Sequence, residues 1–428
     1  MRVLFISSSP IKKEISIGST FLNVFDGIKD VEFASICTKS GTPDPSVSRC
    51  FCITEKMLIN NLLAKGKAGK ELDLNKADHI TGSSTDSGAV SFAKQRRWNI
   101  FFWIQNALWR VGRWKSAELK AFVEDYQPDM IFTVLSDKIF LNRLIRHIIS
   151  LTNAKTVVYA WDNNYSLRKL SFSPFEWIMH FCSRHHMRKT VAKADKLYVI
   201  SDVQKQDYEK AFHKLCTVLT KSADFSQEPS LKIVPSVPLK LVYTGNLYAN
   251  RWKSLAMLVK VLQEINREQP HAELWIYSAS SLTKRMKKAL DVAGCSHFMG
   301  SISAGEVVRV QQEADILVHV EATDLKNRLL VRQSFSTKIV DYLKMARPIV
   351  AIGPKSVASI KHLIDHDCAI VADNPQELLE KLSSVISNTE ALQTIAKNGY
   401  MCGKKYHDKH ATLEMLNIDF CDIMNQNR

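Results

Sequence analysis

Short apolar runs rich in valine and isoleucine recur along the whole chain, separated by longer stretches with helical spacing. In the first half these runs occupy 2–7, 31–37, 130–135, 156–160 and 196–200. In the second half they recur at 239–244, 272–277, 315–320, 348–352 and 368–372. Such alternation of buried strands with helices is typical of a parallel sheet. The pattern predicts an α/β fold with two Rossmann-like β/α/β domains, one in each half.

A proline-rich segment separates the two halves. Residues 226–238 read SQEPSLKIVPSVP, and this density of proline cannot continue a helix or a central strand. We expect a first domain over 1–226, a linker over 227–238 and a second domain over 239–404. A C-terminal helix over 405–428 is expected to pack back on the first domain. Two Rossmann-like domains predict a central cleft between the facing carboxyl ends of their sheets.

The charge balance favours anionic partners. The 428 residues include 58 Lys and Arg against 43 Asp and Glu, which gives a net charge of +15. Such a surplus suits a phosphate-bearing ligand, nucleic acid or an acidic membrane surface. No known RNA- or DNA-binding motif accompanies the charge, so we expect no nucleic-acid partner.

The nine cysteines are an odd number, scattered without a C-x-x-C pair. This spacing predicts reduced thiols rather than a disulfide framework or a structural zinc site. The first apolar run is about five residues long, too short for the core of a signal peptide. No run approaches the roughly 18 residues that predict a membrane-spanning helix. We therefore expect a cytoplasmic protein.

The segment 333–350 has the parts needed to hold a sugar diphosphate. Ser336 is a good N-cap for the helix that follows, and the free N–H groups at Ser336 and Thr337 would attract an anion. Lys338 adds a full positive charge at the same end. Asp341, slightly deeper in the helix, can accept hydrogen bonds from sugar hydroxyls. A capped surface helix that precedes a buried strand explains the same residues without any ligand.

A second segment, Tyr243–Leu255, places cations beside a strand end. Gly245 follows the first strand of the second half and allows the backbone to approach a ligand closely, with Asn246 beside it. Arg251 and Lys253 follow at the start of the next helical pattern. Cations at a helix N-terminus are mildly unfavourable without an anion, so the two residues favour an anionic ligand here. Two solvated basic residues are the alternative.

These two segments resemble the donor-binding half of GT-B glycosyltransferases of family 4. The run S-T-K-I-V-D-Y-L over 336–343 is similar to the bacterial surface-polysaccharide members. The resemblance implies that the second Glu of the family signature corresponds to Asp341 and the first to Gln333. It also implies that Arg251 and Lys253 contact the donor diphosphate. Asp keeps the charge of Glu with a shorter reach, whereas Gln333 lacks the charge.

Further segments follow the family in the same order. The strand that ends at Ser278 resembles the one that faces the nucleotide, and the loop with Gly300 and Ile302 resembles the one that reads the base. Residues 314–321 resemble the strand before the signature. The resemblance covers roughly 237–400 well and the first half weakly.

In the first half, the resemblance extends to the strand pattern and an early glycine loop, which implies acceptor binding at Gly18 and Ser19. Asp162 follows the predicted strand 156–160, so its carboxylate points into the cleft. There it would act with the catalytic cations, orienting an acceptor hydroxyl or the donor sugar. An Asx turn that ends a strand is the alternative.

The resemblance implies a retaining glycosyltransferase that needs no metal or other cofactor. It would move a sugar from a UDP- or GDP-linked donor to a lipid-linked glycan acceptor in bacterial surface or capsular polysaccharide synthesis. Arg251 and Lys253 would stabilise the leaving phosphate, on the face that the acceptor attacks. The alternatives are a catalytically inactive GT-B scaffold subunit and a sugar-nucleotide epimerase of the same architecture.

No metal site is predicted. Asp365-His366-Asp367 matches a D-x-D pattern, but it follows a helix after the donor signature, and chance explains it better. The pair His185-His186 lies in a basic helix without carboxylate or cysteine companions at ligand spacing.

The segment 94–115 reads as a basic amphipathic helix. Trp98, Phe102 and Trp109 share its apolar face, and Arg110 and Arg113 lie on the other. Aromatic residues with flanking cations suit an anionic membrane surface, which predicts peripheral association with the inner face of the cell membrane. RNA binding and a helix packed into the core are the alternatives.

Overall fold

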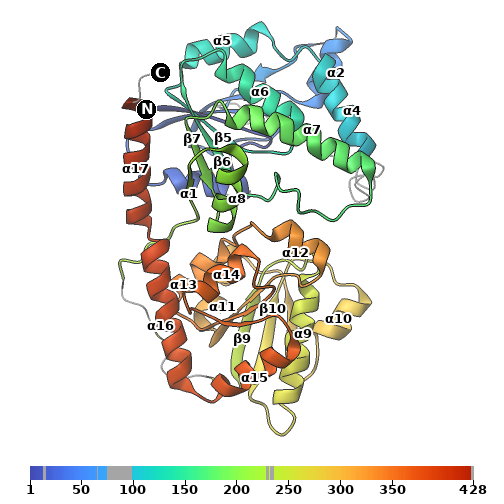
Figure 1. Ribbon diagram of the computed structural model, residues 1–428, viewed down its shortest axis with the longest axis vertical. Coiled ribbons are helices and arrows are strands. Elements are labelled where there is room, and N and C mark those ends of the chain that lie inside the picture. Colours follow the sequence, from blue (N-terminus) through green and yellow to red (C-terminus); the bar gives the residue numbers. More distant parts are fainter. Residues whose placement is uncertain (13–15, 65, 75–98, 228–230, 232–235, 426–428) are drawn as a thin grey trace.

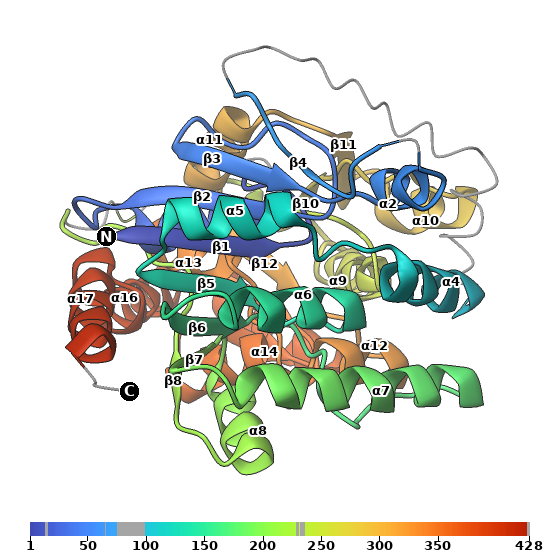
Figure 2. The same ribbon diagram turned by 90° about the horizontal axis from the view of Figure 1, so that it is seen from above.

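The computed structural model describes residues 1–12, 16–64, 66–74, 99–227, 231 and 236–425. These residues form two Rossmann-like domains stacked along the long axis of the molecule, each built on one sheet (Figure 1). The helix α16 (Thr389–Tyr406) runs along the second domain, and α17 (Lys409–Asn425) continues along the first. Seen from above, α5 (Ala117–Tyr126) and α6 (Ile139–Ile149) lie in front of the strands of the first sheet (Figure 2).

The first sheet has the strand order β4-β3-β2-β1-β5-β6-β7-β8. All of its neighbours pair in parallel except β4, which is antiparallel to β3. The strands are β1 (Arg2–Ser7), β2 (Glu32–Cys37), β3 (Val47–Cys52), β4 (Lys70–Glu71), β5 (Met130–Val134), β6 (Lys155–Ala160), β7 (Lys196–Val199) and β8 (Cys216–Val218).

Serine N-caps start several helices of the first domain. Ser116, Ser173 and Ser201 each accept a hydrogen bond from the backbone N–H three residues later, which satisfies a donor that the helix leaves free. The helices are α1 (Ser16–Phe25), α2 (Glu55–Leu62), α4 (Asn99–Val111), α5 (Ala117–Tyr126), α6 (Ile139–Ile149), α7 (Pro174–Val191) and α8 (Asp202–Phe212).

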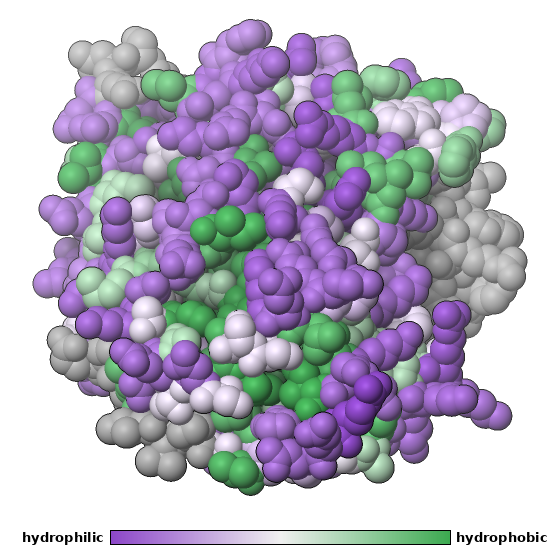
Figure 3. Space-filling model, turned by 60° about the horizontal axis from the view of Figure 1, so that its bottom comes forward, coloured by the Kyte–Doolittle hydropathy of each residue, from purple (hydrophilic) through white to green (hydrophobic). Residues whose placement is uncertain are grey.

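The second sheet is parallel throughout, with the order β11-β10-β9-β12-β13-β14. Its strands are β9 (Leu239–Thr244), β10 (Ala272–Tyr277), β11 (Ser296–Gly300), β12 (Ile316–Val320), β13 (Ile349–Ile352) and β14 (Ile370–Ala372). Its helices are α9 (Arg251–Ile265), α10 (Lys284–Leu290), α11 (Ala304–Glu313), α12 (Leu325–Val331), α13 (Lys338–Lys344), α14 (Ala358–Asp365) and α15 (Pro375–Ile386). Figure 3 brings this end of the molecule forward, and hydrophilic residues cover much of it, with smaller hydrophobic groups between them.

The ten predicted strands are all present, with ends shifted by a residue or two. Four further strands lacked a strong apolar signal. The strand β3 reads VSRCFC, in which two polar residues follow the first valine, and β11 reads SHFMG. The other two, β4 and β8, have only two and three residues.

One membrane-face assignment is wrong. Trp109 is fully buried, with its ring stacked on Phe140 at a centroid distance of 4.5 Å, because this side of α4 packs into the core of the first domain. Phe102, Arg110 and Arg113 are exposed as predicted, and Trp98 lies outside the described residues. Within the described residues, no helix is long and apolar enough to cross a membrane. All nine cysteines are free thiols, as the sequence predicts.

The last helix, α17, is part of the packing of the first domain. Phe420 stacks on Phe25 with ring centroids 5.7 Å apart, and both side chains are buried. Asp419 accepts hydrogen bonds from Lys196 Nζ at 2.6 Å and from the Tyr198 hydroxyl at 2.7 Å. The carboxylate therefore ties α17 to β7.

Asp419→Ala should lower the free energy of unfolding by about 1–3 kcal/mol, because it leaves the Tyr198 hydroxyl and Lys196 without their shared acceptor. Urea unfolding of the full chain measures the change. Asp422→Ala removes an exposed carboxylate from the same helix and serves as the control, with an expected change within about 0.5 kcal/mol. Equal stability of the two variants would show that α17 is not held by Asp419.

Candidate active site

Three charged side chains meet at the carboxyl end of the second sheet. Arg251 starts α9, Glu321 directly follows β12, and Lys338 starts α13. Arg251 donates to Glu321 Oε2 from Nη2 at 3.0 Å and from Nε at 3.2 Å. In open parallel sheets, ligands bind at this end of the strands.

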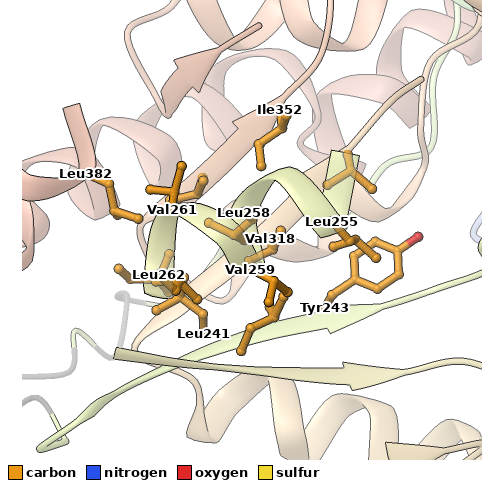
Figure 4. Close-up of a cluster of buried hydrophobic side chains, with 14 of the residues drawn as sticks. Leu241, Tyr243, Leu255, Leu258, Val259, Val261, Leu262, Val318, Ile352 and Leu382 are labelled. Carbon is orange, nitrogen blue, oxygen red and sulfur yellow. The ribbon is translucent and has the colours of Figure 1, made fainter. Parts of the chain in front are cut away.

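The hydrophobic core of the second domain positions the loop beside these charges. Tyr243 packs its ring against the cluster formed by α9 and the sheet, while its hydroxyl points away from the cluster (Figure 4). That hydroxyl donates to the carbonyl of Asn246 at 2.6 Å, which fixes the loop after β9. Ser254 Oγ, one turn into α9, donates to the carbonyl of Glu321 at 2.7 Å and holds β12 against the same helix.

Lys338 reaches back across the end of β9. Its Nζ donates to the Thr244 carbonyl at 2.8 Å and lies 5.3 Å from the centre of the Tyr243 ring. Burial, and then the nearby Arg251 charge, lower the pKa of Lys338 to about 8. A Cβ at position 245 would overlap the Lys338 ammonium, so the glycine leaves room for this ammonium.

Glu321 is 3% exposed, and burial raises the pKa of its carboxyl although Arg251 opposes this shift. His319 lies behind it, with Nε2 3.5 Å from Glu321 Oε1 and without a hydrogen-bond partner. Burial, with the charges of Lys338 and Arg251, lowers the pKa of His319 to about 3, so the ring is neutral near pH 7. Two cations therefore oppose one carboxylate, and the surplus positive charge suits an anionic ligand.

The other residues predicted for the donor site surround this cluster from neighbouring strand ends. Ser278, after β10, donates its backbone N–H to the carbonyl of Gly300 at 2.8 Å. Gly300 has a φ of 76°, and space is open beside its Cα. Ile302 is partly buried, and Asn246 is exposed and accepts from Arg251 at 3.2 Å. Lys253 is exposed on the first turn of α9 and is not part of the pair with Glu321.

The predicted helix cap is wrong by one residue. Lys338 is the first residue of α13, and Thr337 is the capping residue, in a right-handed helical conformation and without a side-chain cap. The N–H of Ser336 instead donates to Ser359 Oγ at 2.9 Å, which holds it against the start of α14. The backbone at Ser336 is thus partly engaged by the protein itself.

Gln333 and Asp341, which the resemblance aligns with the two signature glutamates, both contact the first domain. Gln333 is fully buried, donates to Asp207 on α8, and accepts at its carbonyl from Ser201 Oγ at 2.7 Å. Asp341 pairs with Lys221 Nζ at 2.5 Å. Both residues therefore lie where the domains meet rather than deep inside the second one.

In the first domain, Asp162 lies just beyond β6, and its carbonyl accepts from Gln204 at 2.9 Å. The residue reaches solvent, yet the protein around its carboxyl desolvates it, and this desolvation, together with the Asp137 charge, raises the pKa of Asp162. Gly18 lies in α1, and a Cβ there would overlap the Lys12 backbone. The glycine therefore allows the backbone at Lys12 to pack closely against α1. Ser19 belongs to the same helix, and its side chain lies outside the described residues.

Glu321 was not among the predicted site residues. It ends a run that is otherwise apolar, ILVHVE, and a carboxylate at the end of a buried strand is a usable signal. The burial of the Lys338 side chain was also not predicted, because the sequence shows only a lysine at the start of a helix.

Comparisons with known proteins agree with this geometry. Residues 238–388 match the sequence profile of a family described as "Glycosyl transferases group 1". Sucrose-phosphate synthase from Thermosynechococcus elongatus aligns with a TM-score of 0.62 and 11% identity over 99% of this chain and 98% of that one. HepE from Anabaena, in complex with UDP, aligns with a TM-score of 0.62 and 13% identity over 99% and 100%. The chain has the GT-B fold.

A glycosyltransferase from Rickettsia africae aligns with a TM-score of 0.59 and 13% identity, over 100% of this chain and 99% of that one. No curated protein sequence matches this chain. The prediction of two Rossmann-like domains in a GT-B arrangement is confirmed.

Lys338→Met should stabilise the free protein and weaken anion binding. The lowered pKa means that the folded chain holds this proton less tightly than the unfolded chain, so the charge costs up to about 3 kcal/mol of stability near pH 7. Thermal unfolding should therefore shift upward. Affinity for UDP, measured by calorimetry, should fall by about 2 kcal/mol or more.

The same lysine predicts a pH dependence. Protonated Lys338 attracts a diphosphate and the neutral amine does not, so UDP affinity should fall as the pH rises through about 8. Lys344→Met, an exposed change on the same helix, is the control and should leave both the affinity and its pH profile unaltered. A wild-type affinity for UDP that is flat from pH 7 to 9.5 would contradict a role for Lys338.

Proposed function

We propose that this protein is a glycosyltransferase that takes its sugar from a nucleotide diphosphate donor bound in the second domain. The observation that carries the proposal is the pair of cations, Arg251 and Lys338, fixed beside the buried Glu321 at the carboxyl end of the second sheet. The cluster lies within the segment that matches the group 1 profile. Fixed cations in a partly desolvated site are suited to stabilise a leaving diphosphate.

A UDP-linked hexose is the donor class that we favour over a GDP-linked one. HepE, which shares the fold, was solved with UDP, with UDP and glucose, and with UDP-glucose. In this chain the ends of β10 and β11, at Ser278 and Gly300, would contact the base, and Ile302 would pack against it. Asp341 would exchange its contact with Lys221 for the ribose hydroxyls.

The proposed reaction proceeds with retention of configuration. The acceptor oxygen forms a bond to the anomeric carbon on the face from which the diphosphate leaves, and the bond from that carbon to the phosphate oxygen breaks. The leaving phosphate accepts the acceptor's proton. Arg251 and Lys338 stabilise the charge that develops on the diphosphate, with Lys253 nearby on the same helix, so the step draws its electrostatic stabilisation from side chains rather than from a metal.

The first domain would hold the acceptor. Asp162 lies just beyond β6, where its carboxyl would hydrogen-bond with a sugar hydroxyl of the acceptor. Acceptor contacts at Gly18 and Ser19 remain part of the proposal.

We place the acceptor on a lipid carrier at an anionic membrane surface, in surface or capsular polysaccharide synthesis. The first domain exposes large apolar residues on α4 and at the start of α7, which lie on the same side of that domain (Figures 1 and 2). They are Phe102, Trp103, Ile104, Phe175, Ile178 and Phe181. Arg110 and Arg113 on or just beyond α4 add positive charge. Apolar insertion with nearby cations suits peripheral binding.

Arg251→Ala should reduce transfer from UDP-hexose by roughly 10²–10³ at saturating donor, because a fixed cation on the leaving phosphate is lost. Removal of Arg251 alone leaves Glu321 buried and unpaired, which costs stability. The double variant Arg251→Ala with Glu321→Gln avoids that charge and should be equally slow. Arg267→Ala, an exposed change near the other end of α9, should keep the full rate.

The same assay separates the leading proposal from an inactive scaffold. Gln333, where the family has Glu, is engaged by Asp207, which is the observation that favours the scaffold. Wild-type protein that binds UDP but neither transfers nor hydrolyses any UDP-sugar would support the scaffold and overturn the enzyme. Full activity of the Arg251→Ala variant would refute the assignment of this residue alone.

Replacement of Phe102, Trp103 and Ile104 by Ser should release the protein from anionic vesicles without unfolding it, because all three side chains are exposed. Wild-type binding should require anionic lipid and weaken as salt rises, since charges are screened over about 10 Å at 0.1 M salt. Vesicle co-sedimentation measures both effects. The control replaces Leu215, Val237 and Ile418, exposed apolar residues elsewhere, and should bind normally. Undiminished binding by the α4 variant would exclude this face.

A further inference from the structure

A group of three metal-ligating side chains lies outside the donor cluster, where α14 meets α16. His362 and His366 are four residues apart at the end of α14, and Cys402 comes from α16. One candidate ligand atom from each lies within 4.8 Å of the others. Cys402 Sγ is 3.5 Å from His362 Nε2.

These distances suit a small tetrahedral cation. With metal–nitrogen bonds of about 2.0 Å and metal–sulfur bonds of about 2.3 Å, neighbouring ligand atoms lie roughly 3.3–3.8 Å apart. The pair formed by Cys402 and His362 is already within that range, and the widest separation needs only small side-chain rotations. Two imidazoles and a thiolate favour zinc over magnesium or calcium, which prefer oxygen ligands.

The rings are held in place by their surroundings. His366 stacks on Tyr406 with ring centroids 4.3 Å apart, and His362 makes an edge contact with Phe335 at 5.2 Å. His407 Nε2 lies 3.1 Å from His362 Nε2, and its Nδ1 lies 2.9 Å from Thr220 Oγ1. The aromatic contacts therefore hold the two ligating rings, whereas His407 faces the same nitrogen of His362 that faces Cys402.

The group also borders open space. His362 and His366 line a cavity of about 570 Å³ that extends between the two domains. Lys361, on the same wall, is paired with Asp365 at 2.9 Å, so its charge is partly balanced near the site. The cavity offers a route for an ion and room for a water molecule as a fourth ligand.

We propose that His362, His366 and Cys402 bind one zinc ion, with the fourth coordination site open to the cavity. Binding releases the thiol proton of Cys402 to solvent, so the thiolate offsets part of the zinc charge. The ion joins α14 to α16, the helix that leads from the second domain to α17. This site uses none of the residues assigned to the donor, so it does not depend on the proposed function.

The sequence did not reveal this group. His362 and Cys402 are 40 residues apart, and His366 was noted only within the D-x-D pattern of 365–367. The structure brings these residues together because α16 packs against α13 and β13, which places Cys402 beside the side chains at the end of α14.

The test uses the full chain, stripped with a chelator and titrated with Zn²⁺ or with Co²⁺ as a spectroscopic probe. We expect one ion per chain by elemental analysis, a higher unfolding temperature with zinc, and a thiolate-to-cobalt charge-transfer band in the near ultraviolet. Cys402→Ser should abolish that band. It should also weaken zinc binding by more than the roughly 10–100-fold that loss of an outer partner costs.

The variant His362→Gln with His366→Gln should likewise abolish stoichiometric binding. Cys421→Ser removes an exposed thiol, and His185→Gln with His410→Gln removes two exposed imidazoles. Both controls should bind as the wild type does. Circular dichroism confirms that each variant is folded. Absence of stoichiometric binding by the wild type, or an unchanged band in folded Cys402→Ser, would overturn the proposal.

Discussion

The buried carboxylate of Glu321 fixes the arrangement of charge at the end of the second sheet. A carboxylate that is almost entirely removed from water needs a paired cation, and Arg251 supplies one with two hydrogen bonds. The pair locks the first residue of α9 to the end of β12. Ser254 ties the same helix to the Glu321 backbone, so the guanidinium cannot move independently of the sheet.

Lys338 makes this site positive rather than neutral. Its ammonium reaches the end of β9 only because position 245 lacks a Cβ, and it arrives partly desolvated, with its pKa lowered by burial and by Arg251. Such a charge is unfavourable in the free protein and becomes favourable when an anion binds. Both cations are already in place before the ligand binds, so a diphosphate can bind without a rearrangement of these side chains.

Strands were predicted correctly where the sequence contains a continuous run of apolar residues. Runs such as MIFTV in β5 and ILVHV in β12 are buried throughout and were found, whereas β3 contains the adjacent polar residues Ser48 and Arg49 and was not. Arg251 and Lys338 were found because they lie at helix starts. Glu321 and Cys402 were missed, since their roles depend on partners 70 and 40 residues away. Helical periodicity could not separate the buried side of α4 from its exposed side. The predicted apolar face includes both Trp109, which is buried, and Phe102, which is exposed.

The chain passes between the domains at two points that lie together on one edge of the molecule (Figure 1). Ala223 precedes the linker, and its N–H donates to the His407 carbonyl at 2.9 Å, while its own carbonyl accepts from the Lys409 N–H at 2.9 Å. The break between α16 and α17 is therefore hydrogen-bonded to the start of the other crossing. Since both covalent connections share one seam, a change in the angle between the domains must bend the backbone there. His407 lies at this edge, so a change in the angle between the domains would displace it more directly than it would displace the donor cluster.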